Sequence, residues 1–301
     1  MNYYKEIKNE LIDNELTKKA KDYSKNKSDL THYYNVGKLI VEAQGGEERA
    51  KYGDSLIKEY SKKLTIDLGK GYNISTLKRM RQLYIKIEKG ATVSHQLTRS
   101  HYVEILSLKS INEINYYLSV AIKQNLSYRE LRNRIKLNEY QRLDDATKNK
   151  LINKEETGVS DLVKNPIVVH GNINQNIVEE KCLKKLILED IGHFLRELGD
   201  GFTYIDNEYK IKIGDEYNYI DILLFNIKYN CYVVVELKVT KLSKNHIGQI
   251  QVYMNYINEH IKSVIHNNTI GIIICKEDNK LILKYCSDPR IFSTTYKLVE
   301  V

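Results

Sequence analysis

Apolar residues in the first half of the chain recur at helical spacing. Their positions around residue 80 share one helix face, whereas the basic residues between them point elsewhere. The residues on the apolar face are Leu77, Met80, Leu83, Tyr84 and Ile87. Side chains three and four positions apart lie on the same side of a helix, so this spacing predicts an amphipathic helix.

Two serine–glutamate pairs indicate further helices in the same half. Ser110 precedes Glu113 by three residues, and Ser127 precedes Glu130 by the same distance. In such a capping box the serine hydroxyl and the acid each satisfy a backbone N–H at the start of a helix. We therefore expect the first half of the chain to be α-helical.

The hydrophobic period changes in the second half. A helix is expected from about residue 177 to 198, ending at Gly199, and another at residues 246–261. Short β-rich segments surround the second helix, at residues 202–205, 209–213, 219–226, 232–239, 269–275, 280–285 and 296–299. Their nearly unbroken apolar runs indicate a sheet that is covered on both faces, and hence an α/β or α+β domain.

A polar, asparagine-rich stretch separates the two patterns. It contains Pro166, one of only two prolines, and Gly171, and it follows a strongly charged segment. Exposed linkers commonly have this composition. We therefore expect a helical domain at residues 1–165 and an α/β domain at residues 166–301.

The net charge of +8 is concentrated in the helical half. Residues 1–170 hold 31 basic and 22 acidic side chains, whereas residues 171–301 hold 16 and 17. Residues 71–140 alone carry 12 basic and 5 acidic side chains, a density that favours a polyanion such as nucleic acid. A solvated, lysine-rich surface is the alternative explanation.

The basic side chains that we expect to contact DNA lie in two groups. They are Lys78, Arg79, Arg81, Arg129, Arg132 and Arg134. The last three cannot all share one helix face, so only some of them are expected to reach phosphates. A protein-interaction role for this domain is the competing interpretation.

Several other classes of protein do not fit the composition. No window approaches the eighteen apolar residues of a membrane span, and the first residues lack the apolar stretch of a signal peptide. We therefore expect a cytoplasmic protein with no membrane partner. The four cysteines are far apart and the eight histidines contain no H-x-x-x-H pair, so reduced thiols are expected and no zinc site is predicted.

Charged residues interrupt two of the apolar strands. Glu236 and Lys238 lie two apart in "VVVELKV" and therefore share one strand face, and Asp221 interrupts the preceding strand. If the chain reverses between Tyr229 and Asn230, Asp221 lies opposite Lys238 and diagonal to Glu236. Keeping all three on one face requires a hairpin loop with an even number of residues, or a bulge that has the same effect.

Charges in a buried strand are costly unless they are paired, bind a metal or line a cleft. Two carboxylates can hold Mg²⁺ or Mn²⁺ and leave positions for water and a phosphate oxygen. A neighbouring ammonium, here Lys238, would orient the attacking water or neutralise charge that develops on the phosphate. The alternative is a buried network of Asp221, Lys238 and Glu236 that only fixes the strand register.

These residues resemble a known nuclease signature. Asp221 together with Glu236-Leu237-Lys238 is similar to the PD-(D/E)xK motif, and the surrounding segments, from "FLRELGDGFTYIDNEYKI" to "NTIGIIICK", resemble the C-terminal domain of the YhcG family of bacterial proteins. The blocks "YYNVGKLIVEAQGGEERAKYGDSLIKEYSKKL", "GKGYNISTLKRMRQLY" and "NLSYREL" resemble the helical domain of that family. The similarity extends over nearly the whole chain from about residue 30.

The resemblance implies a restriction-endonuclease-like fold with a central mixed sheet. It implies Asp221, Glu236 and Lys238 as the catalytic trio, with the two acids as ligands of Mg²⁺ or Mn²⁺. It also suggests Gln249 as a catalytic residue, because some branches of the superfamily place a Q-x-x-x-Y motif beside the active site; an ordinary helix glutamine is the alternative. Superfamily members often carry one more acid on the helix before the sheet, for which Glu180 and then Glu197 are the candidates.

The resemblance leaves two classes of function open. The first is a metal-dependent DNA endonuclease, acting in restriction, phage defence or DNA processing, as a homodimer or with a partner from such a system. The second is a nucleic-acid-binding or assembly protein that keeps a nuclease-like fold without catalysis. The intact charged trio favours the enzyme.

Overall fold

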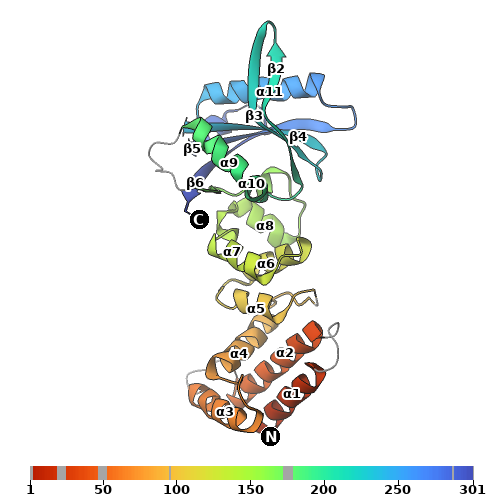
Figure 1. The fold of residues 1–301 in the computed structure, drawn as a ribbon, viewed down its shortest axis with the longest axis vertical. Coiled ribbons are helices and arrows are strands. Elements are labelled where there is room, and N and C mark those ends of the chain that lie inside the picture. The colour runs from red at the N-terminus through yellow and green to blue at the C-terminus, as the bar shows by residue number, and fades with distance from the viewer. Residues whose placement is uncertain are drawn as a thin grey trace. The chain divides into compact units, whose positions relative to one another are not determined.

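The chain folds into two compact units, Met1–Tyr140 and Gln141–Val301. The computed structural model describes residues 3–18, 25–46, 53–94, 96–171, 179–286 and 288–300 (Figure 1). Helices form the first unit and a mixed sheet with helices forms most of the second, as expected from the two hydrophobic patterns. No helix among these residues combines the length and the apolar composition needed to cross a membrane.

The first unit is a helical assembly with one apolar core. Its helices are α1 (Tyr3–Lys18), α2 (Lys25–Ala43), α3 (Gly53–Leu68), α4 (Ile74–Glu88), α5 (Arg99–Ile105), α6 (Ile111–Lys123) and α7 (Tyr128–Lys136). Leu77, Met80 and Leu83 of α4 are buried in the core, which confirms the face predicted for this helix. Helix α2 approaches α4 closely at Gly37, where a Cβ atom would lie 2.2 Å from the carbonyl oxygen of Met80.

Both predicted serine caps are present. The Ser110 side chain accepts a hydrogen bond from the Glu113 N–H at the start of α6. At the start of α7, Ser127 and Glu130 form a reciprocal capping box, in which the glutamate accepts from the Ser127 N–H at 2.7 Å. These local hydrogen bonds explain why the helices begin where the sequence indicated.

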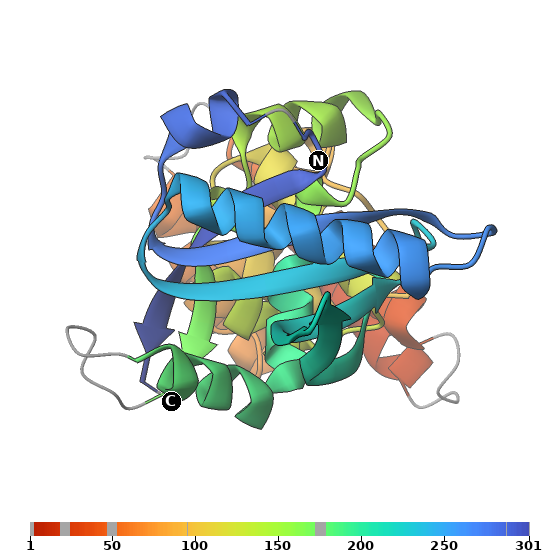
Figure 2. The ribbon, with the colours of Figure 1, turned by 90° about the horizontal axis from the view of Figure 1, so that it is seen from above.

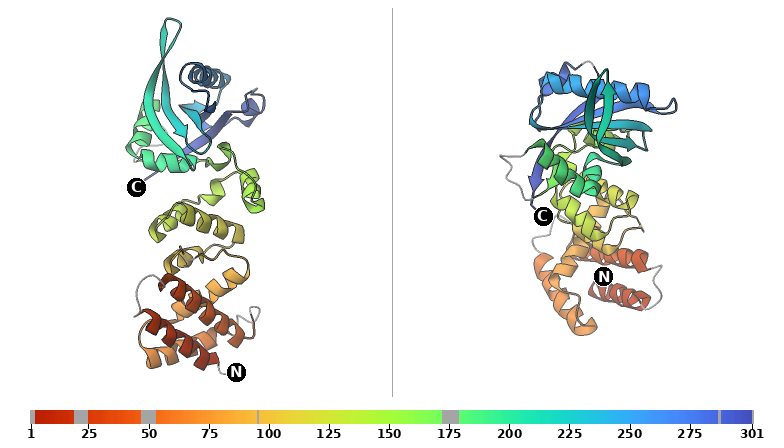
Figure 3. Two further views of the ribbon diagram at one scale, coloured as in Figure 1. Left: turned by 90° about the vertical axis from the view of Figure 1, so that its right-hand side faces the viewer. Right: turned by 45° about the horizontal axis from the view of Figure 1, so that its top comes forward.

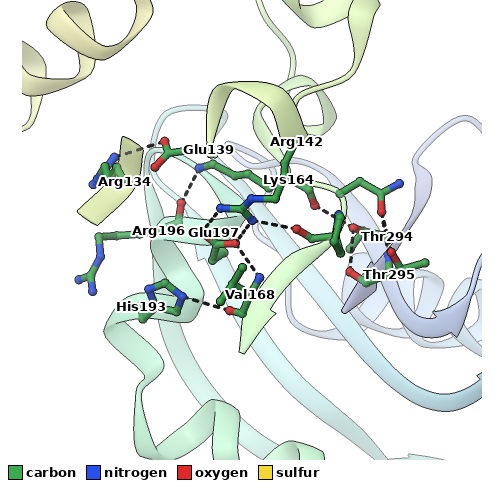
Figure 4. Close-up of polar contacts among 12 residues, drawn as sticks. Arg134, Glu139, Arg142, Lys164, Val168, His193, Arg196, Glu197, Thr294 and Thr295 are labelled. Carbon is green, nitrogen blue, oxygen red and sulfur yellow. Dashed lines mark hydrogen bonds and ion pairs between the residues drawn. The ribbon is translucent and has the colours of Figure 1, made fainter. Parts of the chain in front are cut away.

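Residues 141–165 pack with the second unit, so the observed division comes earlier than the expected boundary at Pro166. This segment contains α8 (Asp145–Asn153) and a short 3₁₀ helix, Ser160–Leu162. Arg142 forms a buried ion pair with Glu197 and donates a hydrogen bond to the Pro166 carbonyl at 2.8 Å (Figure 4). The expected boundary was the polar stretch around Pro166, but these contacts hold the charged segment before it against the sheet domain.

The second unit is built on one mixed six-stranded sheet. Its strands are β1 (Ile167–His170), β2 (Phe202–Ile213), β3 (Glu216–Asn226), β4 (Cys231–Lys241), β5 (Asn267–Glu277) and β6 (Ile291–Val299). Their order across the sheet is β1-β6-β5-β4-β3-β2. The β2–β3 and β3–β4 pairs are antiparallel, whereas β4–β5, β5–β6 and β1–β6 are parallel.

Helices cover both faces of this sheet. Helix α9 (Glu180–Glu189) and helix α10 (Ile191–Leu198) bury Leu183 and Phe194 in one core, together with Val235 of β4. Helix α11 (Lys244–His260) packs on the other face and buries Met254 against β4 and β5 (Figure 2). The β2–β3 hairpin extends beyond the layer formed by α11 and the remaining strands (Figure 3).

Four features of the second unit differ from the sequence-based expectation. The two strands expected at residues 202–205 and 209–213 form one strand, β2, with an irregularity between Tyr204 and Asp206. The helix expected at residues 177–198 is divided at Asp190, whose side chain caps α10 by accepting the His193 N–H, and residues 177 and 178 lie outside the described residues. The strand expected at 280–285 is wrong: Asn279 caps a short helix, α12 (Lys280–Lys284). Strand β1 was not foreseen, because the polar sequence around it predicted a linker.

Candidate active site

The β3–β4 hairpin brings the predicted acids together. Its ladder runs from Asn226 opposite Cys231 to Ile222 opposite Val235, so the loop has the even number of residues that the sequence required. Continuing this register by one position places Asp221 beside Glu236. The expectation that Asp221 lies opposite Lys238 was wrong by two positions. A shift of two keeps Asp221, Glu236 and Lys238 on the same face of the sheet.

The ladder of β3 and β4 ends where Asp221 enters the site. One carboxylate oxygen of Asp221, Oδ2, accepts a hydrogen bond from the Leu237 N–H at 2.9 Å. The other, Oδ1, lies 2.7 Å from Nζ of Lys184 on α9. The Asp221 carboxylate therefore replaces a backbone partner of β4 and is fixed in position between the two strands.

Glu236 is the most buried charged group of the site, with 2% of its surface exposed. Its Oε1 lies 2.9 Å from Nζ of Lys238 and accepts a hydrogen bond from Nε2 of Gln249 at 2.9 Å. Its Oε2 is buried with no hydrogen-bond partner among the described residues. Burial, with the nearby charge of Asp221 as the next contribution, raises the pKa of Glu236 to about 7.

Lys238 and Gln249 hold this carboxyl group from two sides. Burial, the largest single effect, disfavours the Lys238 ammonium, but the contacts with Glu236 and the charges of Glu180 and Asp221 together outweigh burial and raise the pKa of Lys238. Nζ of Lys238 also lies 3.5 Å from Glu180, the first residue of α9. Gln249 lies on α11 and contacts the hydroxyl of Tyr253, one helical turn further on, at 3.1 Å.

Of the two candidates for a further acid, the structure brings Glu180 to the site and places Glu197 elsewhere. Glu197 lies on α10, where it pairs with Arg142 and accepts the Val168 N–H at 2.7 Å (Figure 4). Burial, the largest single effect, opposes ionisation of Glu197, but the contacts with Arg142, the Val168 N–H and the charge of Lys164 together lower its pKa. Its role is to join the segment around Arg142 to the sheet.

The sequence reasoning missed two charged residues of the site, Lys184 and Glu208. Nζ of Lys184 lies 2.7 Å from Asp221 and 3.3 Å from Glu208 of β2. Burial, the largest single effect, disfavours the Lys184 ammonium, but Asp221 and Glu208 together outweigh burial and raise the pKa of Lys184. The four-residue spacing of Glu180 and Lys184 indicated in the sequence that both lie on one face of a helix. Only the position of α9 on the sheet brings that face to Asp221.

This group of side chains suits a hard divalent cation. Four carboxylates, those of Glu180, Glu208, Asp221 and Glu236, face two ammonium groups, which leaves a formal charge of −2 when all are ionised. Carboxylate oxygens are the ligands that Mg²⁺ and Mn²⁺ prefer. The unsatisfied, buried Oε2 of Glu236 is an atom that an ion can satisfy.

The basic residues expected to bind DNA have different environments in the first unit. Arg79 and Arg129 are exposed, and Lys78 is partly buried. Arg132 is exposed and forms a bidentate ion pair with Glu104, with Nε–Oε2 and Nη2–Oε1 distances of 2.9 and 2.7 Å.

Two of the predicted arginines are engaged inside the helical unit. Arg81 donates a hydrogen bond to Gln44 at 2.6 Å. Arg134 is only 9% exposed and pairs with Glu139 and Gln124. The expectation that Arg134 contacts DNA is therefore corrected: its guanidinium is a structural link, because it is buried on the inner side of α7.

Comparison with known proteins agrees with the two-part architecture. Residues 7–142 match a family described as the DUF1016 N-terminal domain, and residues 160–299 match the YhcG PDDEXK nuclease domain. The Escherichia coli (strain K12) protein named "Putative nuclease YhcG" is 28% identical over 284 residues, covering 81% of this chain and 76% of that protein.

A repair endonuclease from Pyrococcus abyssi is a structural neighbour, with 20% identity and a TM-score of 0.30. That match covers 43% of this chain and half of the endonuclease chain. The two family matches together account for most of the sequence, and each coincides with one half of the observed architecture. The chain thus carries a DUF1016 N-terminal domain followed by a YhcG PDDEXK nuclease domain.

Proposed function

We propose that this protein is a metal-dependent nuclease that hydrolyses phosphodiester bonds of DNA, with Asp221, Glu236, Lys238 and Gln249 as its catalytic residues. One observation supports this most strongly. Glu236 is buried with an unsatisfied oxygen, although its other oxygen pairs with Lys238 of β4 and accepts a hydrogen bond from Gln249 of α11. A network that served only to fix strand register would be expected to satisfy both of its oxygens.

Asp221 and Glu236 would hold Mg²⁺ or Mn²⁺. When bound, the ion would polarise the phosphate and make a water molecule more acidic. Lys238 would contribute a positive charge 2.9 Å from Glu236, where it can orient the water and neutralise charge that grows on the phosphate. Gln249 would hold the Glu236 carboxyl group in one rotamer through its hydrogen bond to Oε1.

The helical unit would recruit the substrate. Arg79 and Arg129 are exposed cations in the region of highest positive charge, and Arg132 is exposed although it is paired. Contacts of such residues with phosphates are independent of base sequence and strengthen binding at low salt. Acting on cellular or invading DNA, in restriction, phage defence or DNA processing, the enzyme would work in the cytoplasm.

Cleavage of plasmid and branched DNA in the presence of Mg²⁺ or Mn²⁺ tests the proposal. Asp221→Asn and Lys238→Met should each lower the cleavage rate by roughly 100-fold or more, the usual cost of losing a group that stabilises transition-state charge. Lys241→Met is the matched control, because Lys241 lies on the same strand but pairs with Glu277 at an exposed position.

The control variant should cleave at the wild-type rate, and EDTA should stop the reaction. Equal rates for wild type, Asp221→Asn and Lys238→Met would reject the site. Failure of the wild type to cleave, together with intact DNA binding, would instead support a binding or assembly role.

A further inference from the structure

A second group of metal-ligating side chains lies away from the proposed catalytic residues. His170 ends β1, Asp190 lies between α9 and α10, and His193 is in the first turn of α10. Each offers one ligand atom, and these atoms all lie within 4.8 Å of one another. Within the described ranges this is the one cluster of three or more His, Cys, Asp or Glu side chains that meets this distance.

The orientation of His193 leaves one ring nitrogen available. Its Nε2 lies 3.1 Å from the Val168 carbonyl oxygen (Figure 4). A carbonyl can only accept, so Nε2 carries the proton and Nδ1 keeps its lone pair. Metal-binding histidines usually donate their second nitrogen to a carbonyl or carboxylate in this way, which fixes the tautomer and the ring.

His170 and Asp190 are also fixed in place. The two imidazole rings stack with centroids 4.1 Å apart, and Nδ1 of His170 lies 3.0 Å from Oδ2 of Asp190. Oδ1 of Asp190 accepts the His193 N–H at 3.1 Å, so the carboxylate cannot turn away freely. The strand end is held close to α9 at Gly171, where a Cβ atom would lie 2.7 Å from the side chain of Leu186.

The exposure of the three side chains suits an ion that enters from solvent. His193 is buried, whereas the side chains of His170 and Asp190 are 27% and 46% exposed. The exposed side leaves room for a water molecule as a fourth ligand.

We infer that His170, Asp190 and His193 bind one Zn²⁺ ion, with water completing a tetrahedral site. Two imidazole nitrogens and one carboxylate oxygen are typical zinc ligands, whereas Mg²⁺ prefers oxygen ligands alone. Binding of the ion replaces the hydrogen bond between His170 and Asp190 with two metal bonds. The site joins β1 to the junction of α9 and α10.

This site is distinct from the carboxylate group of Asp221 and Glu236. Helix α9 has Glu180 at its first residue and ends at Glu189, next to Asp190. Its ten residues separate the two ends by about 15 Å. The inference therefore does not depend on the proposed nuclease activity, although the ion would stabilise the helix that carries Glu180 and Lys184.

Zn²⁺ binding to the full-length protein tests the inference. The protein is stripped with EDTA, dialysed and titrated with Zn²⁺ against a chromophoric chelator, and with Co²⁺, whose visible absorption reports tetrahedral coordination. Asp221→Asn is used as the background, so that binding at the proposed catalytic site does not obscure the result. One equivalent of Zn²⁺ should bind, and it should raise the melting temperature.

Asp190→Asn and His170→Gln in this background should each weaken Zn²⁺ binding by at least about tenfold, because even loss of a group that orients a metal ligand costs 10–100-fold. The asparagine introduced by Asp190→Asn can still cap α10, so the circular dichroism spectrum should be unchanged. His260→Gln, at an exposed position of α11, is the matched control and should bind like its parent. Absence of a bound equivalent, or equal affinity in all these variants, would overturn the inference.

Discussion

The raised pKa of Glu236 makes the stability of the protein depend on pH in a defined way. Its carboxyl group has a pKa of about 7 in the folded protein against an ordinary value of 4.5. The folded state therefore binds more protons than the unfolded state between these values, and the free energy of unfolding falls as pH rises through this window. The rise of about 2.5 in pKa corresponds to roughly 3 kcal/mol.

Replacing Glu236 with glutamine removes this dependence while keeping the shape of the side chain. Without added metal, the free energy of unfolding of Glu236→Gln minus that of wild type should increase by roughly 3 kcal/mol between pH 4.5 and pH 8. For a unit of about 160 residues this corresponds to a shift of about 6–12 °C in the difference between the two melting temperatures. Thermal unfolding followed by circular dichroism, in buffers from pH 4.5 to 8.5 with EDTA, measures it.

Two controls isolate the buried carboxyl group. Glu259→Gln removes an exposed carboxylate of α11 that does not contribute to the raised pKa of Glu236, so this variant should follow the pH profile of wild type. Mg²⁺ should raise the melting temperature of the wild type at pH 8 by more than that of Glu236→Gln, because the variant keeps only one of the two proposed carboxylate ligands. Parallel pH profiles for wild type and Glu236→Gln would refute the reasoning.

Other variants test the surroundings of the site and the helical unit. Lys184→Gln removes the ammonium that competes with a cation for Asp221, so Mg²⁺ should bind several-fold more tightly by calorimetry; unchanged or weaker binding would contradict this role. Arg142→Met leaves its buried carboxylate partner on α10 uncompensated and should destabilise the second unit by about 3–5 kcal/mol in denaturant unfolding, whereas a loss below about 1 kcal/mol would argue against the pairing. Arg79→Ala should reduce the slope of log binding constant against log salt concentration by about one, because one phosphate contact is lost. Arg134→Ala should instead lower the free energy of unfolding of the first unit, because Arg134 is buried. The opposite pattern would mean that Arg134 contacts DNA and Arg79 does not.

Local sequence signals were sufficient for several parts of the fold. The serine caps of α6 and α7 depend on residues within one helical turn, and they occur as expected. The shared face of Glu236 and Lys238 follows from the two-residue period of a strand. The prediction failed at Asn279, whose cap begins α12 in an apolar segment, and at Asp190, whose cap divides one expected helix into two. Both caps are local hydrogen bonds across three residues, which hydrophobic periodicity alone does not reveal.

The candidate site shows the same division between local and tertiary information. The sequence placed Asp221 on the same side as Glu236 because the hairpin loop is even, but the turn geometry set the register two positions away from the expected one. Lys184 could not be assigned to the site, since its ammonium reaches Asp221 only after α9 packs on the sheet. Arg134 had the composition of a DNA contact, and only its burial against Glu139 excludes it.

The sequence by itself determined the order of helical and sheet units, the strand faces and the presence of charges at positions that would otherwise be apolar. Periodicity and capping act over a few residues, so they can be read without knowing the neighbours. Only the tertiary structure decided which charges meet: α9 and α11 bring Lys184, Glu180 and Gln249 to the strands, and β1 brings His170 to His193. The physical reason is that the electrostatic energy of a charged group depends on its distance from partners that are remote in the chain and on its burial, and packing sets both.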